Sequence, residues 1–184
     1  MTTASPEPRV VVRDMAETDI EAVSAVRIRG WQHAYAGLMP QSYLDGLDIA
    51  ADAARRRELF ADTSSGMTHL VAEAADGAVV GWACFGPSQD KDVPDGEGEL
   101  YALYARPDLI GSGIGRALMG EVLSRAASCG LRLWVLEGND RARRFYERAG
   151  FRPDGAACAD DVAGSAVPEV RYHRPCGRAS SVTG

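Results

Sequence analysis

The stretch RPDLIGSGIGRALM occupies residues 106–119 and carries glycines at positions 111, 113 and 115. A buried strand is predicted before it, over residues 99–105, and Arg106-Pro107 ends that strand because proline restricts the residue that precedes it. A helix to Cys129 is predicted after it, with Gly130 as its stop. The apolar face of this helix repeats every four residues, at Ile114, Leu118, Val122 and Ala126. The order is therefore strand, glycine-rich turn and helix.

This order suits the binding of a phosphate group. Glycines let backbone N–H groups approach a ligand without a Cβ in the way, and a helix start adds unpaired N–H groups and the positive end of its dipole. Taken alone, Gly-x-Gly-x-Gly is equally consistent with a tight turn that ends a strand. A P-loop is excluded because Arg116-Ala117 replaces its Lys-Ser/Thr pair, and a dinucleotide fingerprint is excluded by the glycine spacing.

A second block follows at residues 133–151. It consists of LWVLEGN at 133–139, ARRFYE at 142–147 and Gly150-Phe151. Together the two blocks resemble the acyl-CoA pyrophosphate motif, the later strand and the Asn-initiated helix of the GNAT superfamily of N-acetyltransferases. The order of elements is similar to that family from about Arg9 to Arg174. One position departs from the pattern, because Ile110 stands where the family usually has Arg or Gln.

The resemblance implies acetyl-CoA as the cosubstrate and no metal. It places the pantetheine arm along the backbone of Leu103, Tyr104 and Ala105 and against Asn139, which also suits a helix N-cap. It places the pyrophosphate on the turn and the helix start, formed by Gly111, Ser112, Gly113, Ile114, Gly115 and Arg116. Three arginines could meet the 3′-phosphate of the nucleotide, although a solvated helix face is the preferred interpretation: Arg141, Arg143 and Arg144.

The resemblance also implies direct attack of an amine on the thioester. Tyr146 matches the tyrosine that protonates the departing thiolate and contacts the cofactor, whereas the competing interpretation is a core aromatic. An alkylamine with a pKa near ~10.4 is mostly protonated at pH 7, so a base is needed. Glu99 is the candidate base and Glu97 is the alternative, and a solvated strand edge is the competing interpretation for Glu99. The acceptor would be lined by Trp31, His33, Tyr35 and an acidic loop, residues 90–97.

The remaining elements follow from propensity and turn signals. A first strand is expected over residues 9–13, and the pair Thr18 and Glu21 predicts a capped helix over 19–29 that stops at Gly30. Residues 31–46 are expected to be irregular and residues 49–61 helical. Strands at 70–74 and 78–85 flank a two-residue hairpin turn, Asp76-Gly77. Asn139 opens a last helix, stopped by Gly150, and two closing strands follow, one after Phe151 and one at 169–173.

Composition limits the classes of function. The net charge of −6 argues against a nucleic-acid binder. No apolar run is long enough to span a membrane, and residues 1–8 lack the features of a signal peptide, so a cytoplasmic location is expected. The cysteine spacing fits neither a zinc site nor a disulfide framework, and no histidine shows the context of a partner for a catalytic thiol. The cysteines are therefore interpreted as packing residues: Cys84, Cys129, Cys158 and Cys176.

These observations predict one α/β (α+β) domain of the GNAT type over residues 9–176, with disordered ends at 1–8 and 177–184. The expected sheet is mixed and mostly antiparallel, with about seven strands, a splayed parallel fourth and fifth pair, and helices on both faces. The expected activity is acetyl transfer from acetyl-CoA to a primary amine of a small molecule, peptide or protein. A non-catalytic acyl-CoA-binding domain and an enzyme for longer acyl-CoA are the alternatives. A homodimer is left open.

Overall fold

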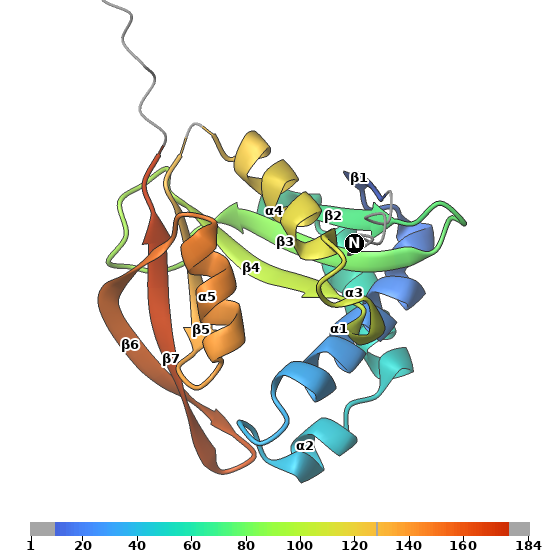
Figure 1. Ribbon diagram of the computed structural model, residues 1–184, viewed down its shortest axis with the longest axis horizontal. Coiled ribbons are helices and arrows are strands. Elements are labelled where there is room, and N and C mark those ends of the chain that lie inside the picture. Colours follow the sequence, from blue (N-terminus) through green and yellow to red (C-terminus); the bar gives the residue numbers. More distant parts are fainter. Residues whose placement is uncertain (1–9, 128, 177–184) are drawn as a thin grey trace, which may run out of the picture.

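The computed structural model describes residues 10–127 and 129–176, and the ends assigned to disorder lie outside these ranges. One sheet of seven strands runs in the order β1-β2-β3-β4-β5-β7-β6 (Figure 1). Its strands are β1 (Val11–Asp14), β2 (Thr68–Glu73), β3 (Val79–Pro87), β4 (Gly98–Ala105), β5 (Leu131–Leu136), β6 (Arg152–Val162) and β7 (Ser165–Arg174). The helices are α1 (Ile20–Ala34), α2 (Gln41–Asp45), α3 (Ile49–Ala61), α4 (Ile114–Arg125) and α5 (Asp140–Arg148).

The sheet is antiparallel except where β4 meets β5. These two strands are parallel, and they pair only at Gly98 with Leu131 and at Glu99 with Arg132. Beyond Glu99 they separate, although β4 continues to Ala105 and β5 to Leu136. The expected seven-stranded mixed sheet with a splayed fourth and fifth pair is confirmed.

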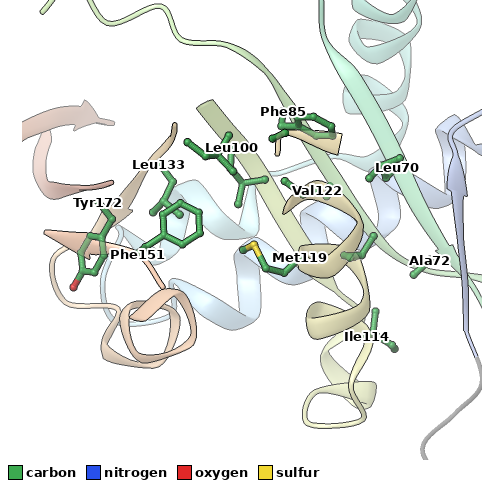
Figure 2. Packing of buried hydrophobic residues seen from close by; sticks show 14 of the residues in the cluster. Leu70, Ala72, Phe85, Leu100, Ile114, Met119, Val122, Leu133, Phe151 and Tyr172 are labelled. Carbon is green, nitrogen blue, oxygen red and sulfur yellow. The ribbon is translucent and has the colours of Figure 1, made fainter. Parts of the chain in front are cut away.

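Two hydrophobic clusters cover the two faces of the sheet. Alternate residues of β2 belong to different clusters, since Leu70 and Ala72 pack under α4, whereas Val71 packs with α1 and α3. Figure 2 shows the first cluster, in which Ile114, Met119 and Val122 of α4 meet side chains from the sheet. The inward stripe predicted for α5 packs against this same cluster: Ala142, Phe145, Tyr146 and Ala149. The helices therefore cover both faces, as predicted (Figure 1).

Helix α1 differs most from its prediction. It begins at Ile20 and passes through Gly30 to Ala34. Gly30 does not end the helix; its missing side chain allows close packing, because a Cβ there would lie 3.0 Å from Cδ1 of Tyr104. The predicted cap at Thr18 is also wrong. The carboxylate of Asp19 instead accepts a hydrogen bond of 2.8 Å from the backbone N–H of Ala16.

Three further boundaries were predicted wrongly. The segment 31–46 is not wholly irregular, since it holds the last turn of α1 and the short helix α2. Helix α4 ends at Arg125 instead of Cys129, because the backbone of Ala126 leaves helical geometry and the N–H of Cys129 bonds to its carbonyl in a tight turn. The β2–β3 connection has three residues, 75–77, and Gly77 closes it with a φ of 85°.

Several predictions hold without change. Helix α3 spans the expected residues, α5 begins after Asn139, and Gly150 follows its end with a φ of 93°. Each of the four cysteines is free. Within the described ranges, no helix combines the length and apolar character needed to cross a bilayer.

Gly81 on β3 sets the distance between α4 and the sheet. A Cβ at Gly81 would lie 2.7 Å from Cγ2 of Ile114 and 2.9 Å from Cδ1 of Leu118. We expect Gly81→Ala to lower the free energy of unfolding by about 1–3 kcal/mol, because the core must shift to accept the methyl group. Urea denaturation measures this change. The control is Gly120→Ala on the exposed face of α4, where a Cβ meets nothing within 4 Å, and it should stabilise the helix by about 0.5–1 kcal/mol. Equal stability of the two variants would contradict this account of the packing.

Candidate active site

The gap between β4 and β5 is the first feature of the site. Tyr101 is an extra residue in β4, since Ala102 pairs with Cys84 and Leu100 pairs with Phe85. Such a bulge bends its strand, and here it stands just beyond the last residue of β4 that pairs with β5. The segment Leu103–Ala105 is hydrogen-bonded to β3 on one side and has no strand partner on the side of β5. Its outer edge can therefore accept an extended ligand.

The glycine-rich turn lies at the end of β4. Gly111 and Gly113 have φ values of 91° and 95°, a region that favours glycine, and α4 begins directly after them. The first bond of the helix runs from the N–H of Ala117 to the carbonyl of Gly113, so the N–H groups of Ile114 and Gly115 precede the helical ladder. These groups and the helix dipole can hold a phosphate.

Ser112 and Ile110 have different roles in this turn. The N–H of Ser112 donates to the carbonyl of Leu109 at 3.2 Å, and its hydroxyl donates to the same oxygen at 2.6 Å. Ser112 therefore holds the turn together in this structure. Ile110, which replaces the usual Arg or Gln, is 37% exposed and adds no charge beside the turn.

Three tyrosines from separate elements meet at the gap. The hydroxyls of Tyr35, at the end of α1, and Tyr104, on β4, are 3.1 Å apart. Tyr146 of α5 lies near both, and burial raises the pKa of all three phenols above the usual value. These hydroxyls therefore stay protonated at neutral pH. We call Tyr35, Tyr104 and Tyr146 the tyrosine cluster.

The ring and the hydroxyl of Tyr146 have different surroundings. Its ring packs against Phe145 and Phe151 in edge-to-face geometry, with centroids 5.4 and 6.0 Å apart. Among the described residues, no side chain or backbone group forms a hydrogen bond with its hydroxyl. The ring is thus a packing element, while the hydroxyl can still donate to a ligand.

Glu99 and Glu97 occupy different environments. Glu99 is 7% exposed, and its carboxylate accepts a hydrogen bond of 3.2 Å from the hydroxyl of Ser88. Burial, together with nearby Asp90, raises the pKa of Glu99. Glu97 instead forms an ion pair with Arg132 and lies 3.4 Å from Nε2 of His173. Glu99 therefore has the raised proton affinity that a base requires, whereas Glu97 is already neutralised.

Arg171 holds the acidic loop in place through ion pairs. The sequence analysis did not single out this residue. The guanidinium forms ion pairs with Asp90, Asp92 and Asp154 at 2.8–3.0 Å. It also lies over the ring of Trp134, whose indole N–H donates to Asp90. The loop carboxylates at 90 and 92 are therefore not simply solvated. Alternation along β7 was the available signal, since it places Arg171 and Glu169 on the face opposite Val170 and Tyr172, which pack in the first core cluster.

The predicted acceptor residues separate into two groups. Trp31 and Tyr35 stack edge to face with centroids 5.3 Å apart, and Tyr35 joins the tyrosine cluster. His33 is exposed in the last turn of α1. The loop after α1 closes one side of the gap, because Leu38 packs so closely on Gly138 that a Cβ there would be 2.8 Å away.

On α5, the predicted ligand residues also divide. The side-chain oxygen of Asn139 accepts from the N–H of Ala142 at 3.1 Å, which confirms the N-cap. Arg143 donates to the hydroxyl of Tyr172 and to the carbonyl of Glu137, so it is occupied within the fold. Arg141 and Arg144 are exposed.

The structure corrects two statements about the cysteines. Cys158 and Cys176 are exposed, so the packing interpretation is wrong for these two. Cys84 does have a histidine neighbour, since its sulfur lies 3.9 Å from Nε2 of His69. Burial raises the pKa of the Cys84 thiol to about 12 and lowers the pKa of His69, so the pair forms no thiolate near neutral pH. The pair is therefore a packing contact in the second core cluster.

Solved structures share this arrangement of elements. A phosphinothricin acetyltransferase from Sinorhizobium meliloti in complex with acetyl-CoA matches with a TM-score of 0.69 and 21% identity, over 91% of this chain and 89% of that chain. The PaiA N-acetyltransferase from Thermoplasma acidophilum in complex with coenzyme A matches with a TM-score of 0.66 and 20% identity, over 91% and 99%. At these identities the likeness establishes the fold.

Sequence comparison establishes the family. An uncharacterized N-acetyltransferase of Mycobacterium bovis is 34% identical over 142 residues, which is 75% of this chain and 86% of that protein. The uncharacterized N-acetyltransferase YuaI of Bacillus subtilis is 30% identical over 88% of this chain and 90% of its own length. The model of the acetyltransferase (GNAT) family matches residues 28–151, which include the gap, the glycine turn and the tyrosine cluster. The chain belongs to the GNAT family and is an acyl-CoA-dependent N-acetyltransferase.

Proposed function

We propose that this enzyme transfers the acetyl group of acetyl-CoA directly to a primary amine of a small molecule, peptide or protein. The observation that carries the proposal is the gap between β4 and β5, which has a glycine-rich turn and a helix start at one end and unionised phenols beside it. The test is release of free CoA thiol from acetyl-CoA across a panel of alkylamines, aminoglycosides and peptides. Thiol release that needs an amine supports the proposal, and its absence with every amine would contradict it.

The cosubstrate would lie along the open edge of β4. Its pantetheine amides would bond to the backbone of Leu103, Tyr104 and Ala105, as an added strand does. The free amide nitrogen of Asn139 would contact the same arm. The pyrophosphate would meet the turn and the first residues of α4, from Gly111 to Arg116. The two solved relatives named above, bound to CoA and to acetyl-CoA, support this choice of cosubstrate.

The reaction follows from the groups at the gap. Glu99 removes a proton from the acceptor ammonium, directly or through water, because only a neutral amine is nucleophilic. The amine nitrogen then bonds to the thioester carbon, and the carbon–sulfur bond breaks. Tyr146 donates its phenolic proton to the departing thiolate, and the second proton of the amine nitrogen leaves as the amide forms and returns to Tyr146 through water. Burial keeps Tyr146 protonated and makes Glu99 more basic, and both shifts favour these roles.

Relatives of known acceptor suggest what the panel should contain. A mycothiol acetyltransferase of Propionibacterium freudenreichii is 34% identical over 61% of this chain, which covers 35% of that protein. The peptidyl-lysine N-acetyltransferase YjaB of Escherichia coli is 39% identical over 34% of this chain and 42% of its own. The panel should therefore include lysine peptides as well as small amines.

The glycine turn predicts how acetyl-CoA affects stability. A ligand that binds only the native state stabilises it by about 2.7 kcal/mol at 100 times its Kd, so acetyl-CoA should raise the thermal midpoint. Gly113→Val should abolish this shift, because the branched side chain blocks backbone approach. Gly77→Val is the matched control, since Gly77 also has a positive φ, 85°, in a hairpin away from the gap. A folded Gly113→Val protein with the full acetyl-CoA shift would contradict the pyrophosphate assignment.

Removal of the Tyr146 hydroxyl tests the general acid. Tyr146→Phe retains the ring that packs on Phe145 and Phe151, so acetyl-CoA affinity should change little. The kcat should fall by about 100-fold, the lower end of the usual range for acid catalysis, if water substitutes in part. Because burial raises the pKa of Tyr146, any loss of rate due to its ionisation should begin above pH 10.

Tyr172→Phe is the control for Tyr146→Phe. Tyr172 is fully buried and donates to Glu147, so its variant should lose stability and retain kcat. Equal kcat of Tyr146→Phe and the wild type with saturating amine would reduce Tyr146 to a packing residue.

The raised pKa of Glu99 predicts the acidic limb of the rate profile. A base works only when it is deprotonated, so the rate should fall as pH drops through a pKa above the ordinary glutamate value of about 4.3. Glu99→Gln should remove this limb and lower kcat, and the loss should be smaller for less basic amines, which need less help to lose a proton. Glu97→Gln should keep the limb, because Glu97 is paired with Arg132. Retention of the limb in Glu99→Gln together with its loss in Glu97→Gln would assign the base to Glu97.

A further inference from the structure

The carboxylates around Arg171 differ in their pairing. Asp90, Asp92 and Asp154 all form ion pairs with Arg171. Glu169 lies two residues before Arg171 on β7, on the same face of the strand. Within residues 10–127 and 129–176, nothing donates a hydrogen bond to the Glu169 carboxylate and no cation pairs with it. Glu169 is thus a half-buried carboxylate without a counter-charge.

Glu169 lies beside the tyrosine cluster. It pairs with Leu136, the last residue of β5, and with Cys158 of β6, so it stands where β5 has separated from β4. It is close enough to Tyr35 and Tyr104 for its charge to help raise their pKa. Tyr146 likewise helps to raise the pKa of Tyr35, and Tyr104 helps to raise the pKa of Tyr146. Glu169 therefore faces the region where an acceptor would meet the thioester.

A second negative group strengthens the local field. The carboxylate oxygens of Glu169 and Asp160 and the sulfur of Cys158 lie within 4.8 Å of one another. Burial and the charge of Asp160 raise the pKa of Glu169, in agreement with the lack of a cation partner among the described residues. A half-buried carboxylate of this kind gains most from a ligand cation, because the protein supplies none.

We propose that Glu169, assisted by Asp160, binds a second positive charge on the acceptor, so that the preferred substrates are amines with an additional ammonium group, such as diamines. This inference rests on the proposed acetyl transfer, and Glu169 determines which amine is accepted. One ammonium binds at Glu169, while the other nitrogen loses its proton and attacks the thioester. A monoamine of equal length leaves the carboxylate unpaired and binds less well.

The experiment compares α,ω-diamines of increasing length with alkylamines in which a methyl group replaces the second ammonium. We expect wild-type kcat/KM to favour the diamine by about 10- to 100-fold at the best length, which is the usual effect of one charge-assisted contact. Glu169→Gln should remove this preference, chiefly by raising KM for the diamine, and should change the monoamine less than about threefold. Glu169→Asp should restore part of the preference. Chelation of metal ions should leave the preference unchanged.

The control is Glu58→Gln, which removes the same charge from an exposed position on α3 and should alter neither substrate. Equal loss for diamine and monoamine in Glu169→Gln, or an intact diamine preference, would overturn the inference. A preference abolished by chelation would assign the cluster to a metal and also overturn it. If acetyl-CoA binds but no amine releases thiol, the proposed function fails instead. In that case, calorimetry of diamine binding to the acetyl-CoA complex tests the inference without turnover. The comparison is between wild type and Glu169→Gln.

Discussion

The separation of β4 from β5 after only two residue pairs is the constraint on which the site depends. A continuous sheet would hydrogen-bond the edge of β4 to its neighbour and leave nothing for a ligand. The bulge at Tyr101 turns β4 away, and the sheet on the other side of β4 remains paired with β3. The strand therefore keeps its position while one edge stays open. The glycine turn then begins the helix α4 at the end of this open edge.

A sheet that opens in its middle needs other contacts between its halves, and these lie at both ends of the gap. At the closed end, Arg171 of β7 holds the loop that leads from β3 to β4, and Arg132 of β5 pairs with Glu97 of the same loop. Most of these charges are shielded from water, so solvent and salt screen their attraction less than that of surface ion pairs. At the other end, Leu38 packs on Gly138. These contacts therefore link the two halves of the protein at both ends of the gap.

The sequence was informative wherever the cause of a structure is local. Asn139 caps α5, Gly150 follows its end, and helix α3 has its expected bounds. The glycine turn was found for the same reason, since its spacing is local. The predictions failed where a residue far away in sequence determines the local structure. Gly30 looked like a helix stop, but the ring of Tyr104, far away in sequence, requires a glycine inside the helix.

Site residues follow the same division. Tyr146 and Glu99 lie next to recognisable motifs, whereas Glu169 and Arg171 lie in a plain strand, and their importance comes from partners in other elements. From the sequence, only the alternation of side chains between the two faces of β7 pointed to these two residues.

The electrostatics of the gap explain why these residue types work together. The phenols of the tyrosine cluster are neutral and held in a poorly hydrated place, so they can donate protons but do not repel an incoming thioester oxygen. The buried Glu99 has an increased affinity for protons, which suits removal of one from an ammonium. A cationic side chain in the gap would lower the pKa of Glu99 and so make it a weaker base. It would also repel the protonated amine. Arg132 and Arg171 instead lie outside the tyrosine cluster and are paired with glutamate and aspartate, and this leaves the acceptor side of the gap negative. Neutral phenols beside a carboxylate without a cation partner therefore suit a cationic amine, which must lose its charge before it reacts.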